Sequence, residues 1–222
     1  MNNDINNTIK NILDNLSLID SDEIPRLDLY IDQITTFMDK HLSKEKRFED
    51  DKILTKTMIN NYAKNELLPP PEKKRYSKDH FLMLIFIYYF KNVLSINDIK
   101  TLLSPISANY FGSDACVDLD YIYKQIASLE TDRVGNLQKD LDNTIKSSQD
   151  LFKECDENDK DFLQLFSFIA SLSFDIYVKK QVIESLIDGL NEQDAKAKAL
   201  AKKQAAAKSQ AKKDAKKEAT KS

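Results

Sequence analysis

The fold class of this chain depends on one apolar run, Phe81-Leu-Met-Leu-Ile-Phe-Ile-Tyr-Tyr-Phe90. Ser77 stands before the run as a candidate N-cap, and Asp79 lies in the first turn, where the helix dipole favours a carboxylate. A helix of this sequence is apolar nearly all round, so we expect it to form the core of its domain. The run has ten residues, whereas a transmembrane helix needs about 20.

The composition of the whole chain also favours a helical protein. Of 222 residues, 41% are hydrophobic, which is enough to build a core, and 3 are Gly. So few glycines argue against an all-β sandwich, a Rossmann fold and any Gly-rich nucleotide loop. We therefore predict an all-α protein.

Apolar periodicity and capping residues predict further helices on both sides of the central run. We expect them at residues 4–19, 27–41, 56–65, 96–103, 119–145 and 162–190. Ser95 and Asp98 resemble a capping box for the helix at 96–103, which Pro105 should follow. The heptad-like stretch from Leu119 to Ile145 fits either a dimerising seam or an ordinary bundle helix. The apolar stretch 162–178 is interrupted by polar residues, so we expect no membrane span.

The net charge of −3 conceals two basic segments. Residues 195–222 contain ten Lys against two acidic residues, a local charge of +8, and residues 52–78 carry +5, which leaves −16 for the rest. Basic segments on an acidic body are typical of a polyanion binder, although two solvated charge runs would look the same. The Lys/Ala-rich tail cannot bury an apolar face, so we predict that it is disordered and either contacts DNA or solubilises the chain.

The stretch from Leu54 to Ser77 combines residues suited to duplex DNA. Thr55 is a candidate N-cap for a short helix that displays Lys56, Thr57, Asn60 and Asn61. Asn side chains can read adenine in the major groove, and Thr and Lys can hold phosphates or base edges. A turn closed by three prolines follows, and then a basic strip, residues 73–76, that is placed to lie along the neighbouring DNA backbone as a wing.

In order and spacing, about 50 residues resemble the DNA-binding domain of MerR-family winged helix-turn-helix regulators. The matching segments are Ile59 to Tyr62, Leu67-Leu68-Pro69, Tyr76-Ser77, Phe81 to Phe90, and Leu94-Ser95 with Ile99, Leu102 and Leu103. The sequence is still more similar, from about Ile24 to Leu190, to a bacterial family catalogued as domain of unknown function eighteen-thirty-six and regarded as MerR-like.

The resemblance implies a role for each matching residue. The side chains expected to face DNA are Thr55, Lys56, Thr57, Asn60 and Asn61. Tyr62, Lys64, Lys74 and Tyr76 would hold the DNA backbone, and the basic strip described above adds Lys73 and Arg75 to the expected DNA-binding residues. Tyr62 and Tyr76 fit core packing equally well, and Asn60 and Asn61 also fit a plain polar helix face. Three departures from the MerR pattern stand out: Glu66 occupies the turn Gly position, Lys74 replaces an Arg, and residues 43–53 intervene before the recognition helix.

These observations predict four segments. Residues 1–23 form an amphipathic helix, 24–105 a MerR-like helix-turn-helix DNA-binding domain, 106–190 a helical dimerisation or effector segment, and 191–222 the disordered tail. The predicted function is a transcriptional regulator that binds double-stranded DNA as a homodimer; the alternative is an adaptor that uses the same domain to bind protein. We expect a cytoplasmic protein, because Met1-Asn2-Asn3-Asp4 is unlike a signal peptide.

We expect neither catalysis nor a cofactor or metal. No arrangement of acids, bases or nucleophiles indicates an active site, and an effector is not identifiable from the sequence. Cys116 and Cys155 flank the long predicted helix and fit passive thiols better than a soft-metal sensor. His41 and His80 fit surface or packing positions better than ligands.

Overall fold

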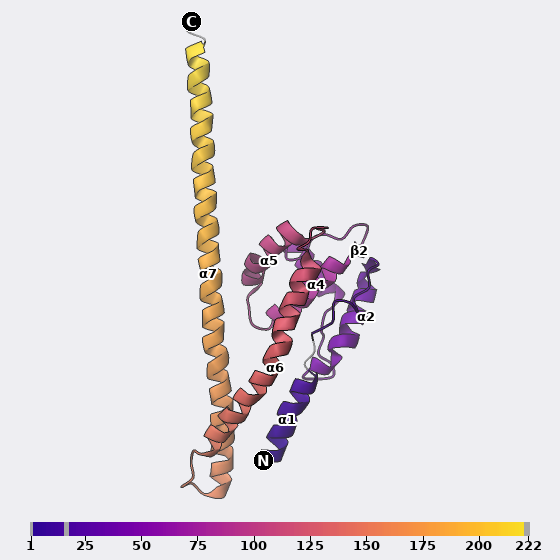
Figure 1. Ribbon diagram of the computed structural model, residues 1–222, viewed down its shortest axis with the longest axis vertical. Helices are drawn as coiled ribbons and strands as arrows, with labels where there is room; N and C mark the ends of the chain where they lie inside the picture. The colour runs from indigo at the N-terminus through magenta and orange to yellow at the C-terminus, as the bar shows by residue number, and fades with distance from the viewer. Residues whose placement is uncertain (1, 16–17, 220–222) are drawn as a thin grey trace. The chain divides into compact units, whose positions relative to one another are not determined.

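The computed structural model describes residues 2–15 and 18–219, and these residues are mostly helical (Figure 1). The α-helices are α1 (Asn2–Asn15), α2 (Ile31–Leu42), α3 (Lys56–Lys64), α4 (Lys78–Phe90), α5 (Ile96–Tyr110), α6 (Leu119–Gln149) and α7 (Glu157–Ala219). A 3-10 helix, η1 (Ser43–Glu45), follows α2, and two short strands are β1 (Leu29–Tyr30) and β2 (Arg75–Tyr76). The chain divides into two compact units, Met1–Val178 and Lys179–Ser222.

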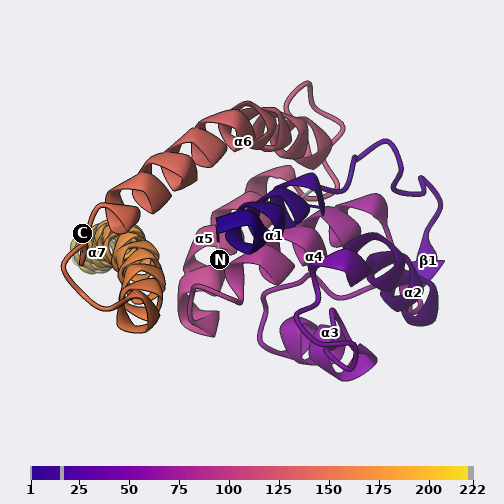
Figure 2. The ribbon, with the colours of Figure 1, turned by 90° about the horizontal axis from the view of Figure 1, so that it is seen from below.

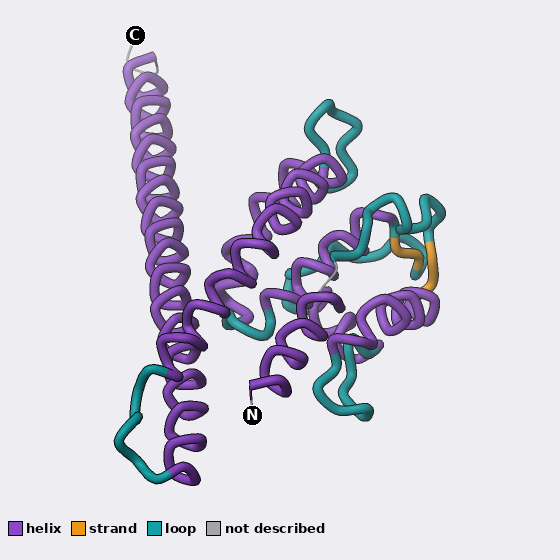
Figure 3. The backbone as a smooth tube through the Cα atoms, turned by 60° about the horizontal axis from the view of Figure 1, so that its bottom comes forward, coloured by secondary structure: helices purple, strands orange, loops and turns teal. Residues whose placement is uncertain are grey.

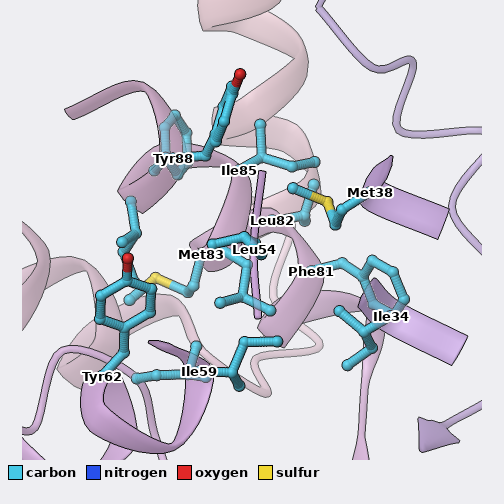
Figure 4. Close-up of a cluster of buried hydrophobic side chains, with 14 of the residues drawn as sticks. Ile34, Met38, Leu54, Ile59, Tyr62, Phe81, Leu82, Met83, Ile85 and Tyr88 are labelled. Atoms are coloured by element: carbon cyan, nitrogen blue, oxygen red, sulfur yellow. The ribbon is translucent and has the colours of Figure 1, made fainter. Parts of the chain in front are cut away.

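Helix α4 is the core of the first unit, as predicted from its apolar run. Every residue from His80 to Tyr88 is buried, and α2, α3 and α5 lie around α4 (Figure 2). Figure 4 shows Ile34 of α2 and Ile59 of α3 beside Phe81 and Met83 of α4. The all-round apolar sequence of α4 is thus matched by neighbours on every side.

The predicted caps are confirmed. The Met58 N–H donates to Thr55 Oγ1 at 3.1 Å, and the Asp98 N–H donates to Ser95 Oγ at 3.2 Å. At the start of α4, the Ser77 N–H donates to Nδ1 of His80 at 2.9 Å, so this histidine serves the helix terminus and packs in the core. Each cap satisfies a backbone or side-chain group that the helix itself leaves unpaired.

One local prediction is wrong. Pro105 lies inside α5 instead of after it, because Ile106 and Phe111 pack against the core and hold the chain on its helical path beyond the proline. The predicted all-α class is supported by the mostly helical structure, which also contains a short antiparallel sheet that the sequence did not predict, with Leu29 paired to Tyr76 and Tyr30 to Arg75 (Figure 3). Its strands are distant in sequence and too short to show a two-residue periodicity.

Helix α6 matches the predicted periodic stretch, and its first turns are part of the core. Tyr123 is buried and its hydroxyl donates to the carbonyl of Ile19 at 2.5 Å. Lys78 of α4 and Asp120 of α6 form an ion pair at 2.8 Å. The predicted N-terminal helix is shorter than expected, since α1 ends at Asn15; Leu16, which was expected within it, lies outside the described residues.

Helix α7 is longer than the sequence suggested at both ends. It begins at Glu157 and continues past Gly189, through the stretch expected to be disordered, to Ala219. The physical reason is helix propensity, because Ala and Lys are among the best helix formers even where no face is buried. Tail residues 220–222 lie outside the described residues.

One stretch of α7 bears on the membrane question. Among the described residues, Asp159–Leu200 is long and apolar enough to cross a membrane when judged by length and composition only. The expectation of no membrane span therefore stays a prediction.

Candidate nucleic-acid interface

Helix α3 separates its residues into a buried face and an exposed polar face. Ile59 is 0% exposed and Tyr62 is buried beside it. The exposed side chains, which lie within about 140° of one another at 100° per residue, are Lys56, Thr57, Asn60, Asn61 and Lys64. The buried face fixes the helix on the core, so the polar face is presented on a rigid support.

The two asparagines of this face are uncommitted. Within the described part of the chain, the side-chain amides of Asn60 and Asn61 make no hydrogen bond. A free Asn amide carries both a donor and an acceptor, the combination that pairs with the major-groove edge of adenine. The structure therefore brings together five of the residues expected to meet DNA on one surface.

Lys56 links this surface to the preceding helix. Its ammonium group pairs with the carboxylate of Asp32 in α2. Both side chains are largely exposed, so the pair is weak and can open to a phosphate. Asp32 lies two residues after Tyr30, whose strand pairs with Arg75, so the start of α3 and the β2 strand belong to one continuous surface.

The two tyrosines expected at the DNA backbone lie in the core instead. Tyr62 is 7% exposed and Tyr76 is 4% exposed, and burial raises the pKa of both phenols. The Tyr76 ring makes an edge contact with the His80 ring, with centroids 5.2 Å apart. Packing is therefore the role that the structure gives these residues, which was the alternative weighed for them. Thr55 likewise acts as the helix cap.

The turn after α3 is a Schellman motif built without glycine. The Leu67 N–H donates to the Tyr62 carbonyl at 2.9 Å, and the Glu66 N–H donates to the Ala63 carbonyl at 3.2 Å. Glu66 has φ 61°, so the left-handed residue that the sequence seemed to lack is the glutamate itself. Its carboxylate pairs with Lys100 at 2.5 Å, a contact that lowers the pKa of Glu66.

The basic strip forms a tight two-residue turn. The Arg75 N–H donates to the Glu72 carbonyl at 2.8 Å, and the two residues form an antiparallel bridge. Lys73 and Lys74 lie between them with φ 48° and 65°. Positive φ at both central positions is the mark of a type I′ turn, which usually contains Asn and Gly. The turn therefore exposes two lysines at its tip.

Arg75 follows the turn and is held beside the first strand. Its guanidinium lies 5.4 Å from the centroid of the Tyr30 ring, a cation–π contact that orients the side chain. Sequence reasoning gave Tyr30 and Asp32 no part in this surface. Neither has a local signal, because both reach it only through the β1–β2 pairing and the packing of α2 on α3.

A second set of contacts positions the segment that leads into α3. The hydroxyls of Tyr88 and Tyr89 donate to the two carboxylate oxygens of Glu45 at 3.3 Å and 3.2 Å. Lys91 donates to the carbonyl of Ile53 at 2.9 Å. Burial raises the pKa of Glu45, and burial also raises the pKa of Tyr88 to about 12, with the nearby carboxylate adding to it. These contacts fasten the insertion between α2 and α3 to the end of α4.

The described residues, 2–15 and 18–219, contain no candidate metal-binding cluster. Cys116 and Cys155 are both exposed and unpaired as thiols. Among residues 2–15 and 18–219, no group of three or more His, Cys, Asp and Glu side chains could hold a metal ion.

Comparison with known proteins finds a similarity over part of the chain, and that similarity names no activity. Neither a curated protein nor a solved structure matches the chain. One family model matches, over residues 19–126, which span β1, α2 to α5 and the start of α6. Over these residues, a little less than half of the chain, the protein is similar to the family described as Domain of unknown function (DUF1836).

Proposed function

We propose that this protein is a DNA-binding transcriptional regulator of MerR-like winged helix-turn-helix type that acts as a dimer. The observation that carries the proposal is the polar face of α3, where Asn60 and Asn61 are uncommitted and flanked by lysines. A helix held by a buried apolar face and presenting free amides is suited to reading base edges.

The dimensions of α3 suit a major groove. An α-helix with its side chains is about 10–12 Å in diameter, and the major groove of B-DNA is about 12 Å wide. In this pose Asn60 and Asn61 meet base edges, whereas Lys56 and Lys64 lie towards the phosphates on either side. Phosphate contacts set the position of the protein, and base contacts supply the sequence preference.

The Glu72–Arg75 turn supplies the second contact. Its tip carries Lys73 and Lys74, and Arg75 follows, so three cations are available to one stretch of DNA backbone. The Lys/Ala tail adds further positive charge, which would strengthen binding to phosphates without contributing to base specificity. In a dimer, two such surfaces would read half-sites about one helical turn, or roughly 34 Å, apart.

The order of elements supports the MerR-like form of the proposal. A helix that ends near Tyr62 is followed by the Leu-Leu-Pro turn, the short basic turn, the apolar helix α4 and the Ser-capped helix α5. This is the order that the sequence resemblance implies. The insertion at 43–53 separates α2 from α3 more widely than a tight helix-turn-helix does, and the contacts of Glu45 and Lys91 fix it in place.

Selection from a random library of duplex DNA tests the proposal. The full chain is immobilised through its N-terminus and bound sequences are enriched at two salt concentrations, since tail-driven binding weakens steeply with salt. We expect an inverted repeat that persists at the higher salt. No enrichment from a folded protein would contradict the proposal and would favour an adaptor that binds protein through the same surface.

A further inference from the structure

The first half of α7 carries an exposed apolar stripe. The residues concerned are Phe162, Phe166, Ile169, Ile176 and Tyr177, whose side chains are between 53% and 65% exposed. At 100° per residue they project within a sector of about 100°, and they extend over roughly 22 Å of the helix. The Phe162 and Phe166 rings stack with centroids 6.3 Å apart. We call these five residues the α7 stripe.

The other side of the same helix segment is already engaged. Phe168 is buried, and it borders one small cavity together with Ile5 and Ile145. The Gln164 amide donates to the carbonyls of Gln149 and Leu151, at 2.7 Å and 2.9 Å. These contacts fasten this part of α7 to the end of α6, so the helix cannot rotate to bury the α7 stripe within its own protomer.

We propose that the α7 stripe is the face through which two copies of this chain pair, with the two helices antiparallel. The inference locates the dimer contact of the proposed function and rests on it to that extent. The seam expected on α6 is less suited, because Leu119 and Ile145 at its two ends are buried within the protomer.

The area of the α7 stripe is sufficient for a modest dimer. With about 150–250 Å² for a fully buried aromatic side chain, the exposed fractions correspond to roughly 600 Å² per protomer. The two copies together would bury roughly 1,200 Å², the lower end of stable protein interfaces. An apolar area of this size is larger than the scattered apolar residues that monomers ordinarily expose.

The order of charges along α7 favours the antiparallel arrangement. Asp159 and Asp161 precede the α7 stripe in the sequence, and Lys179 and Lys180 follow it. Antiparallel pairing centred between Ile169 and Ala170 sets Asp159 of one copy opposite Lys180 of the other and brings Asp161 within one residue of the level of Lys179. It also sets Phe162 opposite Tyr177, whereas a parallel pair would set like charges opposite each other.

A second copy fits this face better than lipid does. The remaining surface of the helix carries Asp161, Asp175 and the buried Gln164, whose amide already caps carbonyls of the protein. A helix that lies on a membrane usually carries Lys or Arg on its polar face instead. The acidic groups therefore oppose contact with anionic headgroups, and in the antiparallel dimer Asp161 lies near Lys179 of the other copy.

Sedimentation equilibrium of the full chain without DNA tests this inference apart from the proposed function. Phe166→Glu should weaken dimerisation by at least about 30-fold, as expected on losing a central interface residue. The matched control is Ser171→Glu, because Ser171 is exposed on the same helix but lies about 170° from the centre of the α7 stripe. It should leave dimerisation unchanged. Both variants should keep the wild-type circular dichroism, since neither side chain is in the core.

A charge exchange tests the direction of pairing. Asp159→Lys with Asp161→Lys should weaken the dimer, and adding Lys179→Glu with Lys180→Glu should restore it. A monomeric wild type, or a Phe166→Glu variant that still dimerises, would overturn the inference. So would a monomer whose binding to neutral phosphatidylcholine vesicles is lost in Phe166→Glu, because that result would make the face a lipid contact. DNA selection reports on the proposed function whichever result is obtained.

Discussion

Removal of a single hydroxyl from Tyr123 should measurably destabilise the first unit. The Tyr123 hydroxyl donates to the Ile19 carbonyl across 104 residues of sequence, and the tyrosine is 2% exposed. Its ring also makes an edge contact with Phe86 of α4, with centroids 5.6 Å apart. Tyr123→Phe keeps the ring and its packing and takes away the donor of a buried carbonyl.

The expected cost follows from that loss. A buried polar group left without its partner costs about 1–3 kcal/mol, and we expect about 2 kcal/mol because the contact is enclosed. For a unit of this size, that corresponds to a melting temperature lower by roughly 4–8 °C. Urea denaturation at fixed protein concentration measures the change in the free energy of unfolding.

A matched control lies two residues away. Tyr121 is in the same helix and is 47% exposed, and its hydroxyl makes no hydrogen bond within residues 2–15 and 18–219. Tyr121→Phe should therefore change the free energy of unfolding by less than about 0.5 kcal/mol. If the two variants were equally stable, the reasoning that α6 is anchored through this hydroxyl would be refuted.

Three further predictions concern the elements around α3. Because burial raises the folded-state pKa of Glu45, the folded protein holds this proton more tightly than the unfolded chain, so the stability of the wild type relative to Glu45→Gln should fall as the pH rises above about 4.5, the ordinary pKa of this carboxyl group; a urea-derived stability that rises with pH above that value would be contrary. Lys73→Asn with Lys74→Gly should raise the free energy of unfolding by about 1 kcal/mol, because Asn and Gly relieve the two positive-φ positions. The same change should weaken the salt dependence of DNA binding by about two phosphate contacts. A variant that is more stable and also keeps the wild-type salt dependence would argue against this account of the turn. Glu66→Gly should melt at a higher temperature than Glu66→Ala, because both variants lose the Lys100 ion pair and only glycine relieves the left-handed backbone. Equal melting temperatures would contradict the claim that the backbone at Glu66 is strained.

The sequence was most informative where the physics is local. Thr55, Ser77 and Ser95 begin helices because a side-chain oxygen or a neighbouring ring can satisfy groups only three residues away, and that spacing is visible in the sequence. The burial of α4 follows from its unbroken apolar run. The exposed residues of α3 could also be predicted, because a helix of known start and period assigns Thr57 and Asn61 to the face opposite Ile59.

Features that depend on distant contacts were not visible in this way. Pro105 stays in a helix because residues beyond it pack on the core, and no local rule describes that packing. Glu66 and the Lys73–Lys74 turn take positive φ although glycine or asparagine is the usual sequence signal for it. Tyr76 fits a phosphate contact or the core equally well in sequence, and only its position beside His80 in the folded chain assigns it to the core.

The most direct test of the central claim compares DNA preference between two double variants of the full chain. Asn60→Ala with Asn61→Ala changes the free amides of α3, and Asn136→Ala with Asn143→Ala makes the same chemical change at exposed positions of α6. The quantity measured is the ratio of affinities for the selected duplex and a scrambled duplex, so the basic tail contributes equally to every protein. The account predicts that the ratio falls at least about tenfold in the α3 variant and stays at the wild-type value in the α6 variant. An unchanged ratio in the α3 variant would contradict the account.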